Sequence, residues 1–60
     1  MEKSTERRHE EIRKYLLAYE RASVNEIARV LDVTPETIRK DFSFLENKGF
    51  LFRTHGGAVL

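Results

Sequence analysis

The sequence predicts a mainly α-helical domain: three helices followed by a small β-hairpin. Three observations predict this fold class. Apolar residues recur at three- and four-residue steps before residue 49, which is the period of amphipathic helices. Residues that cap helices stand where these segments begin. After Gly49 the chain is rich in strand formers, and two glycines interrupt them as a turn would.

Length and composition restrict the class of protein. Sixty residues are enough for one domain, residues 1–60, with a modest core. The absence of cysteine excludes disulfides and thiolate metal sites and is compatible with the cytoplasm. No apolar run reaches the ~20 residues of a membrane span, and Met1–Glu6 lacks the apolar core of a signal peptide. We therefore expect a cytoplasmic protein with no membrane partner.

The first predicted helix covers residues 5–20, with Ser4 or Thr5 as its cap. Leu17 lies off the apolar face and is expected to be exposed. His9 lies on the inner side, where a packed histidine is a better interpretation than a ligand. The inner face consists of Thr5, Arg8, His9, Ile12, Tyr15, Leu16 and Tyr19.

A short strand, residues 22–24, and a second helix, residues 26–31, are predicted next. Asn25 is expected to cap this helix. Asp32 and Val33 form the turn after it. Aspartate tolerates the left-handed conformation better than most residues, and apolar Val33 is expected to fill the gap between helices. Residues 25–48 thus predict a helix, a tight turn and another helix.

The third predicted helix has both ends marked. Thr34 caps it, and Pro35 takes the first helical position, where a missing N–H costs nothing. Gly49 is placed for a left-handed residue just past the end, and Phe50 can fold back onto Leu45 as in a Schellman motif. This helix is expected to span residues 34–48.

One stripe of this helix is apolar and the opposite face is polar. Ile38, Phe42 and Leu45 form the apolar stripe. Asp41 lies at its edge, and we expect a structural ion pair with an arginine such as Arg8 or Arg53. Phe44 flanks the stripe and is expected to be half-buried. The polar face carries Glu36, Thr37, Arg39, Lys40 and Ser43.

Residues 50–60 predict a β-hairpin, or wing. Residues 50–54 and 58–60 are the strands, and His55-Gly56-Gly57 is the turn. An isolated hairpin is unstable in water, so we expect residues 22–24 to add a third strand. The order of elements is that of a winged helix-turn-helix. Because the chain ends on an apolar strand, we expect these residues to be the N-terminal domain of a longer protein.

Several segments resemble the N-terminal domain of DeoR-type bacterial transcription regulators. The most specific are the Thr-Ile-Arg-Lys-Asp-Phe run at 37–42 and His-Gly-Gly-Ala at 55–58. The spacing of Arg8, Ile12 and Leu16 also matches, and the resemblance covers residues 8–58. The remaining matches are Glu26-Ile27-Ala28, Leu31-Asp32-Val33-Thr34, Leu45-Glu46, Gly49, Leu51 and Arg53. Two positions depart from the family: Lys40 replaces a more common arginine, and Phe44 a more common polar residue.

The resemblance implies a winged helix-turn-helix that binds operator DNA. It also implies a C-terminal sensor domain for a phosphorylated sugar or related metabolite, which lies outside these residues. Members are mostly repressors of carbohydrate genes and usually oligomeric. An isolated domain of this kind is expected to be monomeric and to need no cofactor.

The predicted DNA-binding residues belong to the third helix and the wing. Arg39 is the best candidate for a contact with base edges, and Lys40, which lacks the guanidinium fork, for a phosphate contact. Glu36 either complements the helix N-terminus or accepts from a cytosine amine. The full set is Thr34, Pro35, Glu36, Thr37, Arg39, Lys40 and Ser43 in the helix, with Arg53, His55, Gly56 and Gly57 in the wing.

The alternatives to DNA binding are a protein-interaction module and an enzyme. Each polar residue above also fits a solvated surface, and the turn at residues 55–57 also fits a plain hairpin. The formal net charge of +1 is small for a DNA-binding domain and favours the alternative, a winged-helix protein-interaction module. An enzyme is not expected, because no nucleophile–base pair, metal cluster or phosphate loop is visible.

Overall fold

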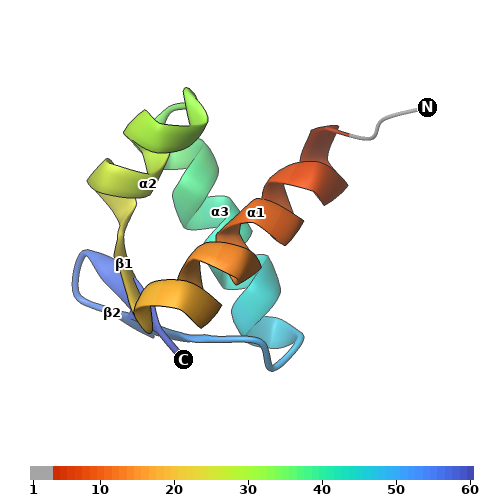
Figure 1. Cartoon of the computed structure of the whole chain (residues 1–60), viewed down its shortest axis with the longest axis vertical. Helices are drawn as coiled ribbons and strands as arrows, with labels where there is room; N and C mark the ends of the chain where they lie inside the picture. Colours follow the sequence, from red (N-terminus) through yellow and green to blue (C-terminus); the bar gives the residue numbers. More distant parts are fainter. Residues whose placement is uncertain (1–3) are drawn as a thin grey trace.

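The computed structural model describes residues 4–60, which form three helices and a three-stranded antiparallel sheet. In chain order these are α1 (Ser4–Tyr19), β1 (Arg21–Ser23), α2 (Val24–Leu31), α3 (Pro35–Asn47), β2 (Phe52–Thr54) and β3 (Gly57–Val59). Helix α1 crosses in front of α3, and the sheet lies at one end of the helices (Figure 1). The predicted fold class is confirmed. The expectation that Met1–Glu6 is not a signal peptide falls partly outside the described residues, because residues 1–3 are not among them.

The start of α2 differs from the prediction. Helix α2 begins at Val24, not Glu26, and its cap is Ser23, not Asn25. The Ser23 hydroxyl accepts a hydrogen bond from the Glu26 N–H at 3.2 Å. Ser23 and Glu26 have the three-residue spacing of a capping box, whereas Asn25 already lies inside the helix. Strand β1 consequently ends at Ser23.

Helix α1 buries only part of its predicted inner face. Ile12 and Leu16 are buried, and Tyr15 packs against the core. Tyr19, predicted to face inward, is instead 65% exposed. The Tyr19 ring contacts the Tyr15 ring, with the two centroids 4.7 Å apart. Leu17 is exposed, as predicted.

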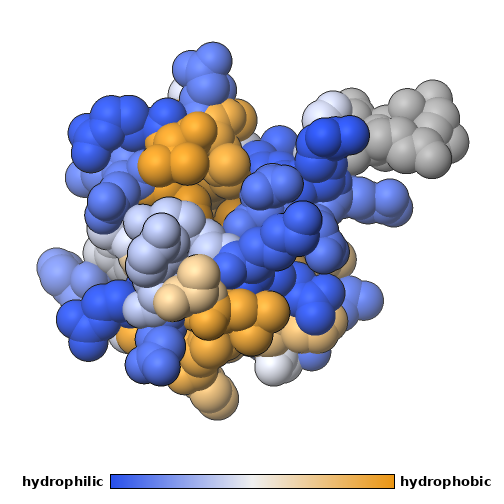
Figure 2. All heavy atoms as spheres, in the orientation of Figure 1, coloured by the Kyte–Doolittle hydropathy of each residue, from blue (hydrophilic) through white to orange (hydrophobic). Residues whose placement is uncertain are grey.

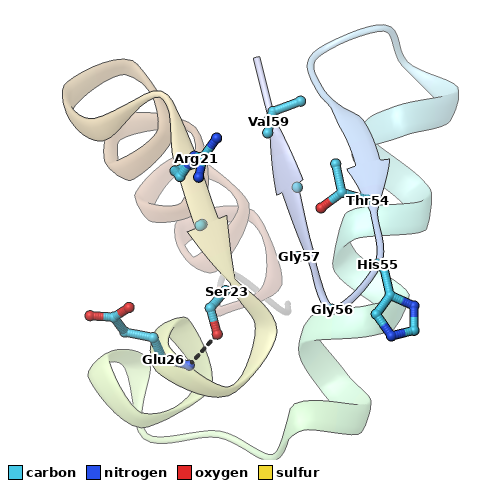
Figure 3. A pocket seen from close by; sticks show the side chains of 10 residues that line it. Arg21, Ser23, Glu26, Thr54, His55, Gly56, Gly57 and Val59 are labelled. Carbon is cyan, nitrogen blue, oxygen red and sulfur yellow. Dashed lines mark hydrogen bonds between the residues drawn. The ribbon is translucent and has the colours of Figure 1, made fainter.

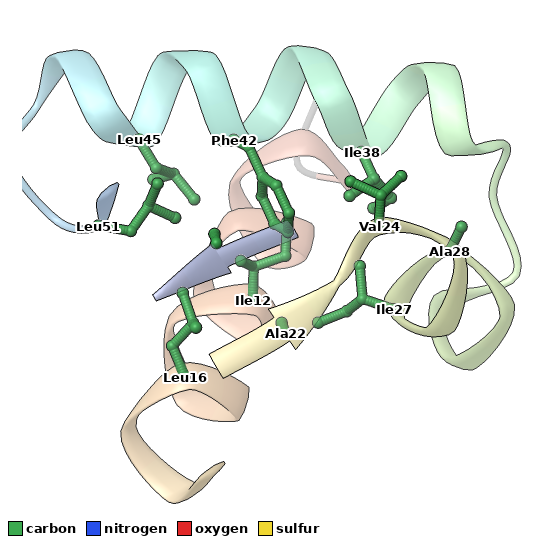
Figure 4. Close-up of a cluster of buried hydrophobic side chains, with 11 residues drawn as sticks. Ile12, Leu16, Ala22, Val24, Ile27, Ala28, Ile38, Phe42, Leu45 and Leu51 are labelled. Atoms are coloured by element: carbon green, nitrogen blue, oxygen red, sulfur yellow. The ribbon is translucent and has the colours of Figure 1, made fainter. Parts of the chain in front are cut away.

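One apolar core joins all the helices to the sheet (Figure 4). The predicted stripe of α3, Ile38, Phe42 and Leu45, lies at its centre, and Val33 packs on its margin. Of the three apolar residues after Gly49, only Leu51 is buried. The buried residues are Ile12, Leu16, Ala22, Val24, Ile27, Ala28, Ile38, Phe42, Leu45, Leu51 and Ala58.

Left-handed residues end all three helices. Asp32 (φ 59°) follows α2, and the Val33 N–H donates to the Ala28 carbonyl at 3.0 Å. Gly49 (φ 85°) follows α3, and the Phe50 N–H donates to the Leu45 carbonyl at 3.0 Å. Both predicted turns are therefore confirmed as Schellman-type closures. Glu20 (φ 71°) follows α1, and its N–H donates to the Leu16 carbonyl at 2.7 Å. 

Strand β3 is the central strand of the sheet, in the order β1-β3-β2. Ala58 pairs with Ala22 on one side and with Arg53 on the other. The predicted third strand is thus confirmed. On the outer surface, apolar side chains gather over the end of α1 and beside the C-terminus (Figure 2). Leu17, Phe50 and Leu60 line a shallow groove there with Arg13.

The two glycines after His55 have different roles. Gly56 (φ 80°) is the second residue of a two-residue hairpin loop, and space around it is open. Gly57, predicted as a turn residue, is instead buried in β3. A Cβ there would lie 2.2 Å from the Ala22 carbonyl oxygen. Gly57 is therefore required by the close approach of β1, not by the turn.

We expect Glu20→Gly to stabilise the domain. The left-handed conformation costs an L-residue about 1 kcal/mol, and the extra freedom of an unfolded glycine cancels roughly half of this. The melting temperature should rise by about 2–4 °C. Glu11→Gly, in the exposed middle of α1, is the control and should lose about 1 kcal/mol in urea unfolding. A loss from both changes would contradict this account of Glu20.

We expect Gly57→Ala to disrupt the sheet. The added methyl must displace the β1 backbone, which should cost about 2 kcal/mol or more. Gly56→Ala is the control, because it strains φ by about 1 kcal/mol without a steric clash. Thermal unfolding and exchange of the Val24 amide, which donates to the Gly56 carbonyl, measure the two effects. Equal destabilisation by the two variants would be the contrary result.

Candidate nucleic-acid interface

The first turn of α3 presents polar groups to solvent. Thr34 caps the helix, and its hydroxyl oxygen accepts from the Thr37 N–H at 3.2 Å. The Thr34 and Thr37 hydroxyls lie 3.1 Å apart. Thr34, Pro35 and Glu36 are exposed. This end of α3 offers hydroxyls and the positive end of the helix dipole to an anion.

The next turn of α3 carries the two cations of the predicted site. Arg39 and Lys40 are both exposed. The Arg39 Nη1 lies 3.5 Å from the Glu36 Oε1, and their side chains are 51% and 77% exposed. A pair this exposed and this long contributes little to stability, so the guanidinium is available to another partner. Five of the seven residues predicted in this helix are exposed, whereas Thr37 and Ser43 are partly buried.

A buried ion cluster holds the opposite side of α3 against α1. The Asp41 side chain is 6% exposed. Its Oδ2 accepts from the Arg8 Nε, and its Oδ1 accepts from the Arg8 Nη2 at 3.0 Å. The His9 Nε2 lies 2.9 Å from the same Oδ1. This arrangement joins two helices through one carboxylate, and the two contacts of the Arg8 guanidinium fix its direction.

The cluster confirms the structural role predicted for Asp41. Arg8 is the partner, whereas Arg53 bonds elsewhere. His9 is packed as predicted, with its ring stacked on Phe44 at a centroid distance of 4.8 Å. Phe44 is 46% exposed, which agrees with the half-buried position expected for it. The contact between His9 and Asp41 was missed. Its only signal in the sequence is that His9 follows Arg8 on the inner face of α1.

The wing contacts α3 directly through Arg53. The Arg53 Nη1 donates to the Ser43 hydroxyl at 2.8 Å, and the Arg53 backbone N–H donates to the Glu46 Oε2 at 2.9 Å. Ser43 is partly buried by this packing. Both residues were predicted to bind DNA, and the structure places them side by side. Glu46 was not predicted to have a role.

The hairpin tip is exposed at His55 and Gly56. On the side of β1 and α2, a shallow groove runs along Arg21, Ser23, Glu26 and Thr54 to this tip (Figure 3). The His55 ring points away from β1 in the same view. Gly57 lies within the sheet and not at the exposed tip, and glycine is required there by the close approach of β1. Most of the predicted residues thus belong to two exposed regions, the start of α3 and the wing tip, with Ser43 and Arg53 between them.

Residues 4–60 lack the features of a metal site and of a membrane span. No group of three or more histidine, cysteine, aspartate or glutamate side chains is arranged to hold a metal ion there. None of the described helices is long and apolar enough to cross a membrane.

Two helices joined by a tight turn, with a hairpin after the second, define a winged helix-turn-helix domain. The chain belongs to the DeoR-like helix-turn-helix domain family, whose model matches residues 8–60. The resemblance seen in the sequence is confirmed by this match. The family and the named relatives described next identify a DNA-binding domain of the transcription-regulator class.

Three relatives illustrate the similarity. An uncharacterized HTH-type transcriptional regulator of Staphylococcus epidermidis is 50% identical over 80% of this chain and 19% of its own length. The L-fucose operon activator of Haemophilus influenzae is 59% identical over 65% of this chain and 16% of its own. The lactose phosphotransferase system repressor of Staphylococcus aureus is 53% identical over 57% of this chain and 14% of its own length.

These relatives are much longer than the chain. The chain spans less than a quarter of the length of each of the three. No solved structure matches the chain significantly. The names of the relatives support DNA binding and transcription regulation, and they do not favour the alternative of a protein-interaction module.

We expect Asp41→Asn to destabilise the domain. It removes the charge that the Arg8 guanidinium and the His9 ring face, and breaking such a pair from one side should cost about 2 kcal/mol or more. Glu36→Gln removes a carboxylate from an exposed pair on the same helix and should change stability by less than about 0.5 kcal/mol. Urea unfolding at neutral pH compares the two. Similar small changes from both would refute the anchoring role of Asp41.

Proposed function

We propose that this chain is the operator-binding domain of a bacterial transcription regulator, with residues 34–48 in the DNA major groove. The observation that carries the proposal is the division of α3 into two sides. One side is buried by the core and by the Asp41 cluster. The other exposes a guanidinium, an ammonium and hydroxyls, the groups that bind base edges and phosphates.

Within this proposal the residues of α3 divide by chemistry. Arg39 reads base edges, because its planar fork matches the paired acceptors of guanine. Lys40 and Thr37 bind phosphates or bases. Thr34 offers its hydroxyl and the helix-end N–H groups to a phosphate, and Pro35 and Glu36 border the same contact.

The wing supplies a second contact near the backbone or the minor groove. Gly56 lets the main chain approach the duplex closely, since no side chain projects from the loop tip there. His55 donates to a phosphate. Arg53 and Ser43 lie where the wing meets α3, so the two contacts form one continuous surface. Gly57 acts indirectly, by allowing the sheet to close.

We also propose that the chain is the N-terminal domain of a longer regulator of carbohydrate genes, acting as a repressor in the cytoplasm. Relatives named for an L-fucose operon and for lactose phosphotransferase support a sugar-related role. One of them is named an activator and the other a repressor, so this type of domain serves both directions of control. A separate sensor domain would bind a sugar-phosphate-type effector and bring two copies together. Pairing would provide the affinity that a single small module lacks.

Arg39 and Lys40 should differ when replaced by alanine. The test begins with a duplex selected by this chain from a random library, compared with a scrambled duplex. Arg39→Ala should lose about 1–3 kcal/mol on the selected duplex and much less on the scrambled one. Lys40→Ala should weaken both equally and reduce the slope of log K against log salt by about 1.

Fluorescence anisotropy over a series of salt concentrations measures both quantities. Equal, sequence-independent losses for the two variants would remove Arg39 from base reading. Binding by the unmodified chain that does not fall as salt rises would contradict the proposed function itself, because phosphate contacts release counterions.

A further inference from the structure

The link between α3 and the wing depends on a residue outside the predicted site. Glu46 lies in the last turn of α3 and is exposed. Its Oε2 accepts the Arg53 backbone N–H at 2.9 Å. Arg53 pairs with Ala58 of β3, and its N–H points away from β3 towards α3. The carboxylate therefore occupies the hydrogen-bonding edge of β2, which would otherwise be open.

A second contact fixes the same point of the wing. The Arg53 guanidinium donates to the Ser43 hydroxyl at 2.8 Å, three residues before Glu46 on α3. The main chain and the side chain of Arg53 are thus both hydrogen-bonded to residues of α3. Two residues further along the chain lies His55, at the exposed tip.

The other attachments hold the wing to the core and to α2. Leu51 anchors the start of β2 in the core. The Gly56 carbonyl accepts from the Val24 N–H at 2.9 Å, which ties the tip to the start of α2. Within residues 4–60, the two hydrogen bonds of Arg53 are the polar contacts between β2 and α3.

We propose that Glu46 is a positioning residue for DNA binding: it sets the separation between the α3 recognition face and the wing tip. This inference rests on the proposed function, because it assumes that both surfaces contact one duplex. Glu46 acts through Arg53 and is not itself a DNA contact, since its carboxylate would repel phosphates. Without its hydrogen bond, the position of β2 relative to α3 would have to be fixed at the moment of binding.

The test compares Glu46→Ala with Glu46→Gln. Both variants lose the negative charge, so they change electrostatic attraction to DNA equally. Glutamine keeps a side-chain oxygen that can accept the Arg53 N–H, whereas alanine does not. Both residues are good helix formers, and loss of a negative charge near the C-terminus of α3 favours the helix, so both variants should fold.

We expect the alanine variant to bind the selected duplex about three- to tenfold more weakly than the glutamine variant, the range that one net hydrogen bond supplies. In amide chemical-shift titrations, it should lose DNA-induced shifts at His55 and Gly56 and keep those at Thr37–Lys40. The Arg53 amide should exchange faster in the alanine variant alone.

Equal affinities of the two variants, or a uniform loss of shifts over both regions, would overturn the positioning role. Unchanged exchange of the Arg53 amide would do so as well. A failure of the proposed function is distinguishable, because the unmodified chain would then show no salt-sensitive shifts in either region. That result would overturn both proposals, whereas a failure confined to the variant comparison would overturn only this one.

Discussion

The carboxylate of Asp41 fixes the orientation of α3 against α1. Burying a charge is costly unless it is paired and hydrogen-bonded, and here an arginine and a histidine from one turn of α1 meet that requirement. Apolar packing of Ile38, Phe42 and Leu45 supplies the attraction between the elements but tolerates small rotations. The directional hydrogen bonds between Arg8 and Asp41 do not tolerate such rotations. The exposed face of α3 is therefore set by interactions on its opposite side.

The wing is oriented by a different kind of interaction. Strands β1 and β3 are joined through small residues, Ala22, Gly57 and Ala58, which allow the two backbones to approach closely. Close approach fixes the distance between strands, and the polar contacts of Arg53 fix the edge nearest α3. The exposed start of α3 and the wing tip are thus held by independent groups of contacts, both of which involve α3.

Local signals in the sequence predicted most of the fold, and long-range contacts were the main omissions. The caps and left-handed residues of α3 and the turn at Asp32 depend on neighbours within a few positions, so their predictions were confirmed. Ser23 was overlooked because it is both the last residue of β1 and the cap of α2. Gly57 and Glu46 depend on partners 35 and seven positions away, Ala22 and Arg53, so periodicity carried no information about them.

The central position of β3 affects the order in which the domain can fold during synthesis. Residues 57–59 leave the ribosome last among the three strands, yet β1 and β2 pair only with them. Until then both strands are unpaired, and the core lacks Ala58. The helix pair α2–α3 is formed by neighbouring segments and can associate earlier, because local contacts require little loop closure. Helix α3 is therefore organised before the wing, and the sheet closes only when β3 is complete.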